Sequence, residues 1–379
     1  MSYNDVFVID SVIHALDNRR VDGAATPETV KFVQPVVEGD YGYETSIMPE
    51  QYRRGEWFHS LPGVETLISA VFNESYTDMG VFHGVPMPGI FKDYSPITIG
   101  YEIKKRYPNR TLLYGPISTF FGVQASIDEI DRQHEEYGLS GVKFYPTDFI
   151  DGEFKSMSLA DKDELYPILQ HIEDIGIKSV AVHKAAPLGV TPMDPYRVGD
   201  MDYAARDFPN LTFEVVHGGM AFLDESAFQI ARYPNMYINM EVTAHYAMSQ
   251  KRKFAQIMGE LLLMGGEDKL LFATGCSFSH GRPVIEAFMD FEMPQDMLDG
   301  GYPEVTPEIK RKIMGENMAR IHGIDIDERR KLLENDDIET ERREKGLRAP
   351  WSRITDGTRD RGEVFDEAEE LVPHAGWGA

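Results

Sequence analysis

Three histidines each stand at the end of a segment that is typical of a buried strand. His14 follows "DVFVIDSVI", His183 follows "KSVAV" and His217 follows "LTFEVV". In an α/β barrel the carboxyl ends of the strands meet at one mouth, where catalytic side chains gather. Neutral imidazole is a good ligand for Zn²⁺, Fe²⁺, Mn²⁺ or Ni²⁺. One such histidine more often only satisfies a backbone carbonyl, but three at one mouth favour a metal-binding active site.

Apolar strands that alternate with amphipathic helices must position these histidines. The expected strands are, in chain order, 5–14, 78–86, 110–118, 140–146, 178–185, 211–219, 235–242 and 269–275. Such alternation predicts parallel strands that helices cover on their outer face. A doubly wound sheet and a closed barrel both satisfy the pattern. The number of units favours a (β/α)8 TIM barrel over about residues 5–325.

Two segments lie outside this alternation. Residues 20–62 lack a regular period and are too long for an ordinary loop, so we interpret them as an insertion over the barrel mouth. From residue 326 the chain mixes charges with few apolar residues and cannot form a core alone. We predict one domain over 1–325 and a C-terminal extension or arm over 326–379. This arm is either disordered or packed on its own barrel or another subunit, which would cover Trp351 and Trp377.

The composition excludes several classes of partner. A formal net charge of -25 repels phosphate backbones and anionic lipids, so neither nucleic acid nor a membrane is expected as a partner. The single cysteine, Cys276, excludes an intrachain disulfide and fits a reducing compartment. No apolar run of about 18 residues is present, and the N-terminus lacks a secretory signal. We expect a cytoplasmic homo-oligomer that binds a small-molecule substrate.

The strand-end motifs, taken in order, resemble one family. "VFVIDSVIH", "GVKFYP", "VAVHKA", "TFEVVHGG" and "LLFATGCSFSH" are similar to strand ends of the amidohydrolase superfamily, in its group of metal-dependent hydrolases and decarboxylases. The resemblance implies a TIM barrel with one divalent metal ion, which we expect to be zinc, with iron or manganese as alternatives. It implies His14 and His183 as metal ligands. It also implies that His217 assists catalysis, and we count His217 among the candidate ligands.

Two positions depart from the family's pattern. Val12 stands where the family has the first of two histidines, and Gly275 stands where it has an aspartate that binds the metal and takes a proton from water. A carboxylate base contributes about 10²–10⁴-fold to a rate, so ordinary hydrolysis needs a substitute. Glu241, at the end of the seventh strand, could supply it or could pair with a basic residue. Cys276 could bind the metal as a thiolate, although free cysteines are more often inert small hydrophobes.

Three more residues near strand ends are candidates for the site. His280 could donate a proton or bind the metal, or it could cap the segment that follows. Lys143, at the end of the fourth strand, could neutralise a substrate carboxylate or pair with Glu241. Arg282 could recognise an anionic group or pair with Glu286 one turn along a helix.

The sequence therefore leaves two functions open. The first is a metal-dependent enzyme that acts on a small carboxylate, lactone or amide by hydrolysis or decarboxylation. The second is a diverged barrel without catalytic activity, an accessory or maturation protein. Val12 and Gly275 favour the second function, and the three histidines favour the first.

Overall fold

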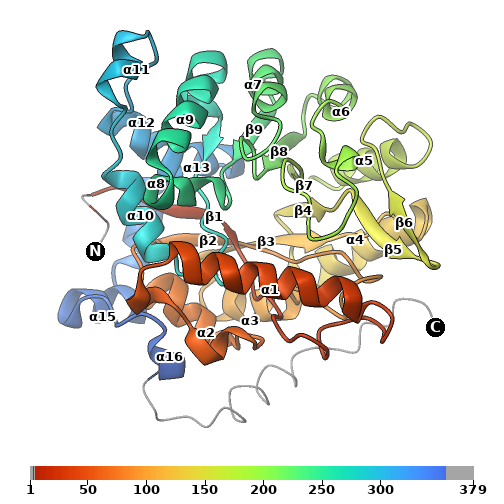
Figure 1. The fold of residues 1–379 in the computed structure, drawn as a ribbon, viewed down its shortest axis with the longest axis horizontal. Coiled ribbons are helices and arrows are strands. Elements are labelled where there is room, and N and C mark those ends of the chain that lie inside the picture. Colours follow the sequence, from red (N-terminus) through yellow and green to blue (C-terminus); the bar gives the residue numbers. More distant parts are fainter. Residues whose placement is uncertain (1–2, 4, 356–379) are drawn as a thin grey trace.

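Eight parallel strands form the centre of the molecule (Figure 1). The computed structural model describes residues 3 and 5–355. The strands pair in the order β1-β2-β3-β4-β7-β8-β9-β10. They are β1 (Ile9–Ile13), β2 (Met79–His83), β3 (Thr111–Pro116), β4 (Gly141–Phe144), β7 (Ser179–His183), β8 (Thr212–Val216), β9 (Met236–Asn239) and β10 (Leu270–Leu271). Each lies within one of the eight expected segments, so the predicted (β/α)8 barrel is confirmed.

The sheet closes between its first and last strands. Past the end of β10, the chain continues beside β1. The Gly275 N–H donates to the carbonyl of Val12 over 3.0 Å. The His14 N–H donates to the carbonyl of Cys276 over 2.6 Å. Because these bonds join the two ends of the sheet, the strand ends that carry the histidines surround one mouth.

Helices cover the outside of the barrel, and α7 and α9 pack side by side (Figure 1). The barrel helices are α2 (Val64–Ile68), α3 (Ile97–Arg106), α4 (Val123–Tyr137), α5 (Leu165–Asp174), α6 (Met201–Asp207), α7 (Leu223–Arg232), α8 (Tyr246–Ser249), α9 (Lys251–Gly265), α10 (Gly281–Met289), α11 (Gln295–Asp299), α12 (Pro307–Arg311) and α13 (Asn317–His322). None of the described helices is long and apolar enough to cross a membrane.

Side chains alternate between the outer face of the barrel and its interior. On β7, Val180 and Val182 pack in the large outer cluster with the helices. Ala181 belongs to the inner cluster, with Ile9, Met79, Val81, Tyr114, Val216 and Leu271. Because successive side chains of a strand point to opposite faces, His183 points inward like Ala181. The same alternation turns Lys143 of β4 inward, because Val142 and Phe144 pack outside.

The segment 20–62 contains a helix that the sequence did not predict, α1 (Val30–Ile47). Its buried residues Val33, Val36 and Val37 pack in one cluster with residues that follow β2 and β4, among them Val85, Met87 and Tyr145. A separate hairpin, β5 (Thr147–Ile150) and β6 (Glu153–Ser156), follows β4 and was not predicted either. Both additions therefore lie at the carboxyl ends of strands, where the histidines are.

The C-terminal extension forms α14 (Ile326–Leu333), α15 (Asp337–Lys345) and α16 (Ser352–Thr355). The buried guanidinium of Arg342 donates to backbone carbonyls within residues 72–77. Trp351 is 1% exposed, and its indole N–H donates to the carbonyl of Tyr52 over 2.8 Å. The described part of the extension thus packs on its own barrel. Trp377 lies outside the described residues.

Candidate functional site

The structure brings His14, His183 and His217 together at the barrel mouth. His14 directly follows β1, His183 ends β7 and His217 directly follows β8. All three side chains are buried. Nε2 of His217 lies 3.2 Å from Nδ1 of His183. Nε2 of His14 lies 3.0 Å from Oε1 of Glu241, whose Oε2 is 3.5 Å from Nε2 of His217. We call these four residues the histidine–glutamate cluster.

Each imidazole of this cluster donates its outer N–H to a backbone carbonyl. His14 Nδ1 contacts the carbonyl of His83 over 2.7 Å, and His183 Nε2 contacts that of Ala186 over 2.8 Å. His217 Nδ1 contacts the carbonyl of Glu241 over 3.1 Å. A carbonyl oxygen only accepts, so the proton of each neutral ring must be on this outer nitrogen. The inner nitrogens of His183 and His217 therefore present lone pairs, whereas Nε2 of His14 forms a hydrogen bond with Oε1 of Glu241.

The cluster therefore holds three buried acceptor groups: the inner nitrogens of His183 and His217 and the carboxylate of Glu241. Burial lowers the pKa of His217 to about 4 and that of His183 well below its ordinary value, so both rings are neutral near pH 7. Burial alone would raise the pKa of Glu241, but His217, His14 and Lys143 outweigh it and hold that pKa well below its usual range. Two neutral imidazole lone pairs 3.2 Å apart repel each other unless a cation or a proton lies between them.

The donor chemistry of the cluster fits a divalent cation. Ligand atoms at about 2.1 Å from a tetrahedral ion are about 3.4 Å apart, close to the separations seen here. Oε2 of Glu241 is also buried without a hydrogen-bond partner among the described residues. Within those residues, however, no three His, Cys, Asp or Glu side chains already surround one point as a complete ligand set. The inner atoms instead form two close pairs, His183 with His217 and His14 with Glu241, and a bound ion would have to bring these pairs closer together.

Gly275 leaves the space that the carboxylate of Glu241 occupies. A Cβ built on Gly275 would lie 2.9 Å from Oε1 of Glu241 and 3.2 Å from its Cγ. Gly275 also has a φ of +70°, which side chains with a Cβ rarely adopt. The carboxylate that the family pattern has after β10 is thus missing, and one from the end of β9 lies in its place. This arrangement supports the interpretation of Glu241 as the substitute.

Lys143 lies within the same interior. Its Nζ is 5.5 Å from the ring centre of Tyr145, and that ring stacks on His183 with centres 4.2 Å apart. The ammonium is fully buried and has no hydrogen-bond partner among the described residues. Burial lowers the pKa of Lys143 to about 8. It is therefore still largely protonated at pH 7.

Three other candidates have surroundings apart from the cluster. The side chain of Cys276 packs in the outer hydrophobic cluster, and burial raises the pKa of its thiol strongly, which disfavours the thiolate. His280 caps α10, where its Nδ1 accepts from the Arg282 N–H, and its Nε2 contacts Glu74 over 3.1 Å. Arg282 pairs with Glu286 over 2.9 Å. For His280 and Arg282 these are the structural roles that the sequence left open beside the catalytic ones.

A buried polar chain deeper in the barrel was not predicted from the sequence. Glu214 accepts from the Tyr114 hydroxyl over 2.7 Å and from the amide of Asn239 over 2.9 Å. The side-chain oxygen Oδ1 of Asn239 in turn accepts from the backbone N–H of Glu241 over 3.3 Å. This chain fixes the backbone at the end of β9. A polar residue at an inward position of an apolar strand, such as Glu214 in "LTFEVV", is the sequence signal that could have revealed it.

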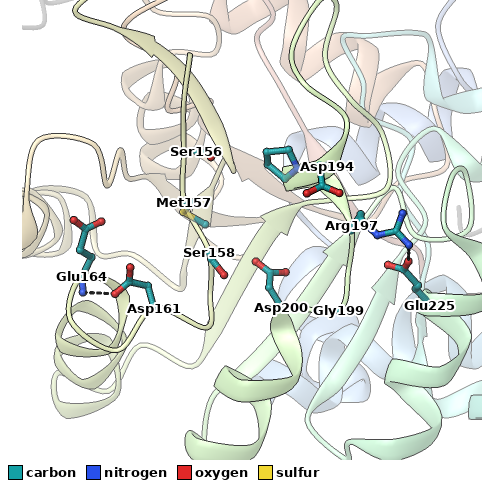
Figure 2. Close-up of a pocket in the computed structure, with 11 residues that line it drawn as sticks. Ser156, Met157, Ser158, Asp161, Glu164, Asp194, Arg197, Gly199, Asp200 and Glu225 are labelled. Carbon is teal, nitrogen blue, oxygen red and sulfur yellow. Dashed lines mark hydrogen bonds and ion pairs between the residues drawn. The ribbon is translucent and has the colours of Figure 1, made fainter. Parts of the chain in front are cut away.

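A separate pocket of about 500 Å³ lies between the end of β6 and the residues before α6 (Figure 2). Its lining is strongly acidic and consists of Ser156, Met157, Ser158, Asp161, Glu164, Asp194, Pro195, Arg197, Gly199, Asp200 and Glu225. Arg197 pairs with Glu225, and Asp200 pairs with the buried Lys184 over 2.8 Å. Lys184 directly follows His183, so the two side chains diverge. No member of the histidine–glutamate cluster lines this pocket.

The fold and the cluster place the chain in the class of TIM-barrel proteins that carry candidate catalytic side chains at the strand ends. Within this class the chain belongs to the amidohydrolase family, whose model matches residues 118–324. No curated protein matches the sequence.

Solved structures share the fold at low sequence identity. The TIM-barrel protein Bb4693 from Bordetella bronchiseptica is 16% identical, with a TM-score of 0.54 over 84% of this chain and 99% of that chain. A 5-carboxyvanillate decarboxylase from Novosphingobium aromaticivorans, complexed with manganese, is 12% identical, with a TM-score of 0.52 over 85% and 98%. A putative metal-dependent hydrolase from Lactobacillus casei is 12% identical, with a TM-score of 0.52 over 84% and 96%. These likenesses support the barrel.

Proposed function

We propose that this chain is a metal-dependent enzyme that acts on a small carboxylate, lactone or amide by hydrolysis or decarboxylation. One observation carries the proposal: three imidazole nitrogens and a carboxylate converge in a buried cluster, where the lone pairs of His183 and His217 lie 3.2 Å apart and Oε2 of Glu241 has no hydrogen-bond partner among the described residues. Membership of the amidohydrolase family supports it. The decarboxylase from Novosphingobium aromaticivorans, which has the same fold, was solved with manganese.

The residues that would hold the ion are His14, His183, His217 and Glu241. When bound, a divalent cation would polarise a substrate carbonyl or acidify a water molecule. The backbone carbonyls that accept the outer N–H of each ring fix its orientation and its tautomer, as in many metal sites. The polar chain from Glu214 through Asn239 holds the backbone of Glu241 through its N–H.

Glu241 has a second task in this proposal. Its Oε2 is the atom of the cluster that can accept a proton from water or from the substrate, because it has no hydrogen-bond partner among the described residues. Its low pKa keeps it ionised, which favours ligand binding and charge stabilisation over strong basicity. α1 packs over this side of the barrel, and the residues of the cluster are 2–6% exposed, so bulk water has little access.

Turnover of a panel of small lactones, amides and aromatic carboxylates, with added Mn²⁺ or Zn²⁺, tests the proposal. Glu241→Gln should lower the rate of any reaction found by about 10²-fold or more, because it removes the proton acceptor and the charge. Glu286→Gln, which changes a carboxylate outside the cluster, is the matched control. A Glu241→Gln variant that turns over substrate at the wild-type rate would contradict the assigned role.

A barrel that has lost catalysis is the second candidate. Two observations favour it. Val12 lacks a ligand atom, and no three candidate side chains among the described residues form a complete ligand set. Under this alternative the hydrogen bond between His14 and Glu241 is a structural contact. A folded, metal-free protein that binds no Mn²⁺ or Zn²⁺ would support it.

A further inference from the structure

The position of Lys143 in β4 places its ammonium on the side of the histidine–glutamate cluster that faces the barrel interior. Lys143 pairs in register with Ala181 of β7, two residues before His183 on the same inward face. Its side chain therefore starts one layer deeper in the barrel than the imidazole of His183. The ammonium lies beside the ring of Tyr145, which stacks on that imidazole. Lys143 thus extends from the barrel interior toward the atoms proposed to react.

The carboxylates nearest to this ammonium already have other partners. Glu241 pairs with His14 over 3.0 Å, and Glu214 accepts from Tyr114 and Asn239. None of the three N–H groups of Lys143 has a hydrogen-bond partner in the described part of the chain. Both carboxylates still attract the ammonium through space. Burying an ammonium without direct hydrogen bonds is strongly unfavourable, so a group that supplies them should bind tightly here.

A second buried lysine shows what a structural role looks like in this protein. Lys184, equally inaccessible to solvent, donates to the carbonyl of Pro195 over 2.7 Å and pairs with Asp200 over 2.8 Å. Arg282, the other basic residue considered for substrate binding, pairs with Glu286 instead. Lys143 differs from both because its ammonium faces the cluster without a direct partner.

We propose that Lys143 binds a carboxylate group of the substrate, and that the substrate is therefore a small organic acid rather than a neutral lactone or amide. This inference rests on the proposed function of the histidine–glutamate cluster. A carboxylate would accept charge-assisted hydrogen bonds from the ammonium in a buried setting, where such bonds are strong. It would also place the rest of the molecule against His183, His217 and Glu241. A neutral substrate would leave the ammonium uncompensated.

The experiment measures the binding of acetate, benzoate and malonate by calorimetry, with acetamide and benzamide as neutral counterparts of similar shape. Lys143→Met and Lys143→Gln remove the charge in two ways, so one of them should fold if the other does not. We expect both variants to lose about 10- to 100-fold in affinity for the acids, as for the loss of one charge-assisted hydrogen bond, and to bind the amides as the wild type does. Lys184→Met is the matched control and should leave acid binding unchanged.

Thermal unfolding of the ligand-free variants separates binding from structure. Replacing a buried ammonium that has no direct partner should leave the melting temperature unchanged or raise it, whereas Lys184→Met should lower it. The inference is overturned if the wild type binds none of the three acids, if acid and amide affinities fall equally, or if Lys143→Met lowers the melting temperature and leaves acid affinity unchanged. Failure of the proposed function has a different signature: acid binding would depend on Lys143, but the protein would hold no metal and catalyse no reaction.

Discussion

Replacing Gly275 by aspartate restores the residue that the amidohydrolase pattern has at this position, yet we expect the change to destabilise the protein. Gly275 has a φ of +70°, and forcing a residue with a Cβ into this conformation costs about 1–2 kcal/mol. The new Cβ would lie 2.9 Å from Oε1 of Glu241, so that carboxylate must move. The two carboxylates would then share a buried site in which like charges disfavour each other's ionised form.

We expect Gly275→Asp to lower the free energy of unfolding by about 3–5 kcal/mol, of which about 1–2 kcal/mol is backbone strain and the rest comes from placing a second buried carboxylate beside that of Glu241. Urea denaturation at pH 7, followed by tryptophan fluorescence, measures this difference. Gly275→Ala is the matched control because it adds the strain and the Cβ without the charge. In a Glu241→Ala background, the cost of Gly275→Asp should fall to the strain alone, which gives a coupling energy of about 2–3 kcal/mol.

Two results would refute this reasoning. If Gly275→Asp is as stable as Gly275→Ala, the second carboxylate is accommodated without conflict. If Gly275→Asp costs the same with and without Glu241, the carboxylate of Glu241 does not occupy the place beside residue 275. Either result would remove the argument that Glu241 substitutes for the missing aspartate.

Two further predictions concern stability. Burial raises the pKa of Asp10 to about 7, although the Thr274 N–H donates to its carboxylate. The folded state therefore keeps a proton that the unfolded state releases near pH 4. The contribution of Asp10 to the free energy of unfolding should be present below about pH 4 and fall by up to about 4 kcal/mol as the pH rises to 7. Asp10→Asn should remove this part of the pH dependence in denaturation experiments from pH 4 to 7, and an unchanged slope would count against it. Trp351→Ala should cost about 3–5 kcal/mol because it empties a buried site and breaks the bond to Tyr52, as urea denaturation would show. A loss below about 1 kcal/mol would mean that the extension does not stabilise the barrel.

The barrel could be predicted from the sequence because its strands are short apolar runs between amphipathic helices. Even β10, which spans two residues in the structure, was found within the apolar run "KLLFATG". The convergence of the histidines could be predicted because the sequence shows which residues end a strand, and the strand ends of a barrel meet at one mouth. α1 could not be predicted, since it contains Pro35 and two glycines and buries only a narrow set of residues.

The relation between Glu241 and Gly275 could not be predicted either. It depends on the contact between the ends of β9 and β10, which no local pattern records. The sequence showed that a carboxylate was missing at residue 275 and that one was present at residue 241, but not that the second lies in the space left by the first. Zinc as the metal, a homo-oligomer and a cytoplasmic location remain predictions from the sequence.

Metal content is the measurement that most directly tests whether the three inward-facing imidazoles and Glu241 hold a cation. The wild type, incubated with Mn²⁺ or Zn²⁺ and desalted, should retain about one equivalent per chain by elemental analysis. His183→Ala and His217→Ala should lose it. His171→Ala should retain it, because His171 lies outside the cluster and pairs with Asp131. A folded wild type that retains neither metal, or a His183→Ala/His217→Ala double variant that retains a full equivalent, would contradict the account.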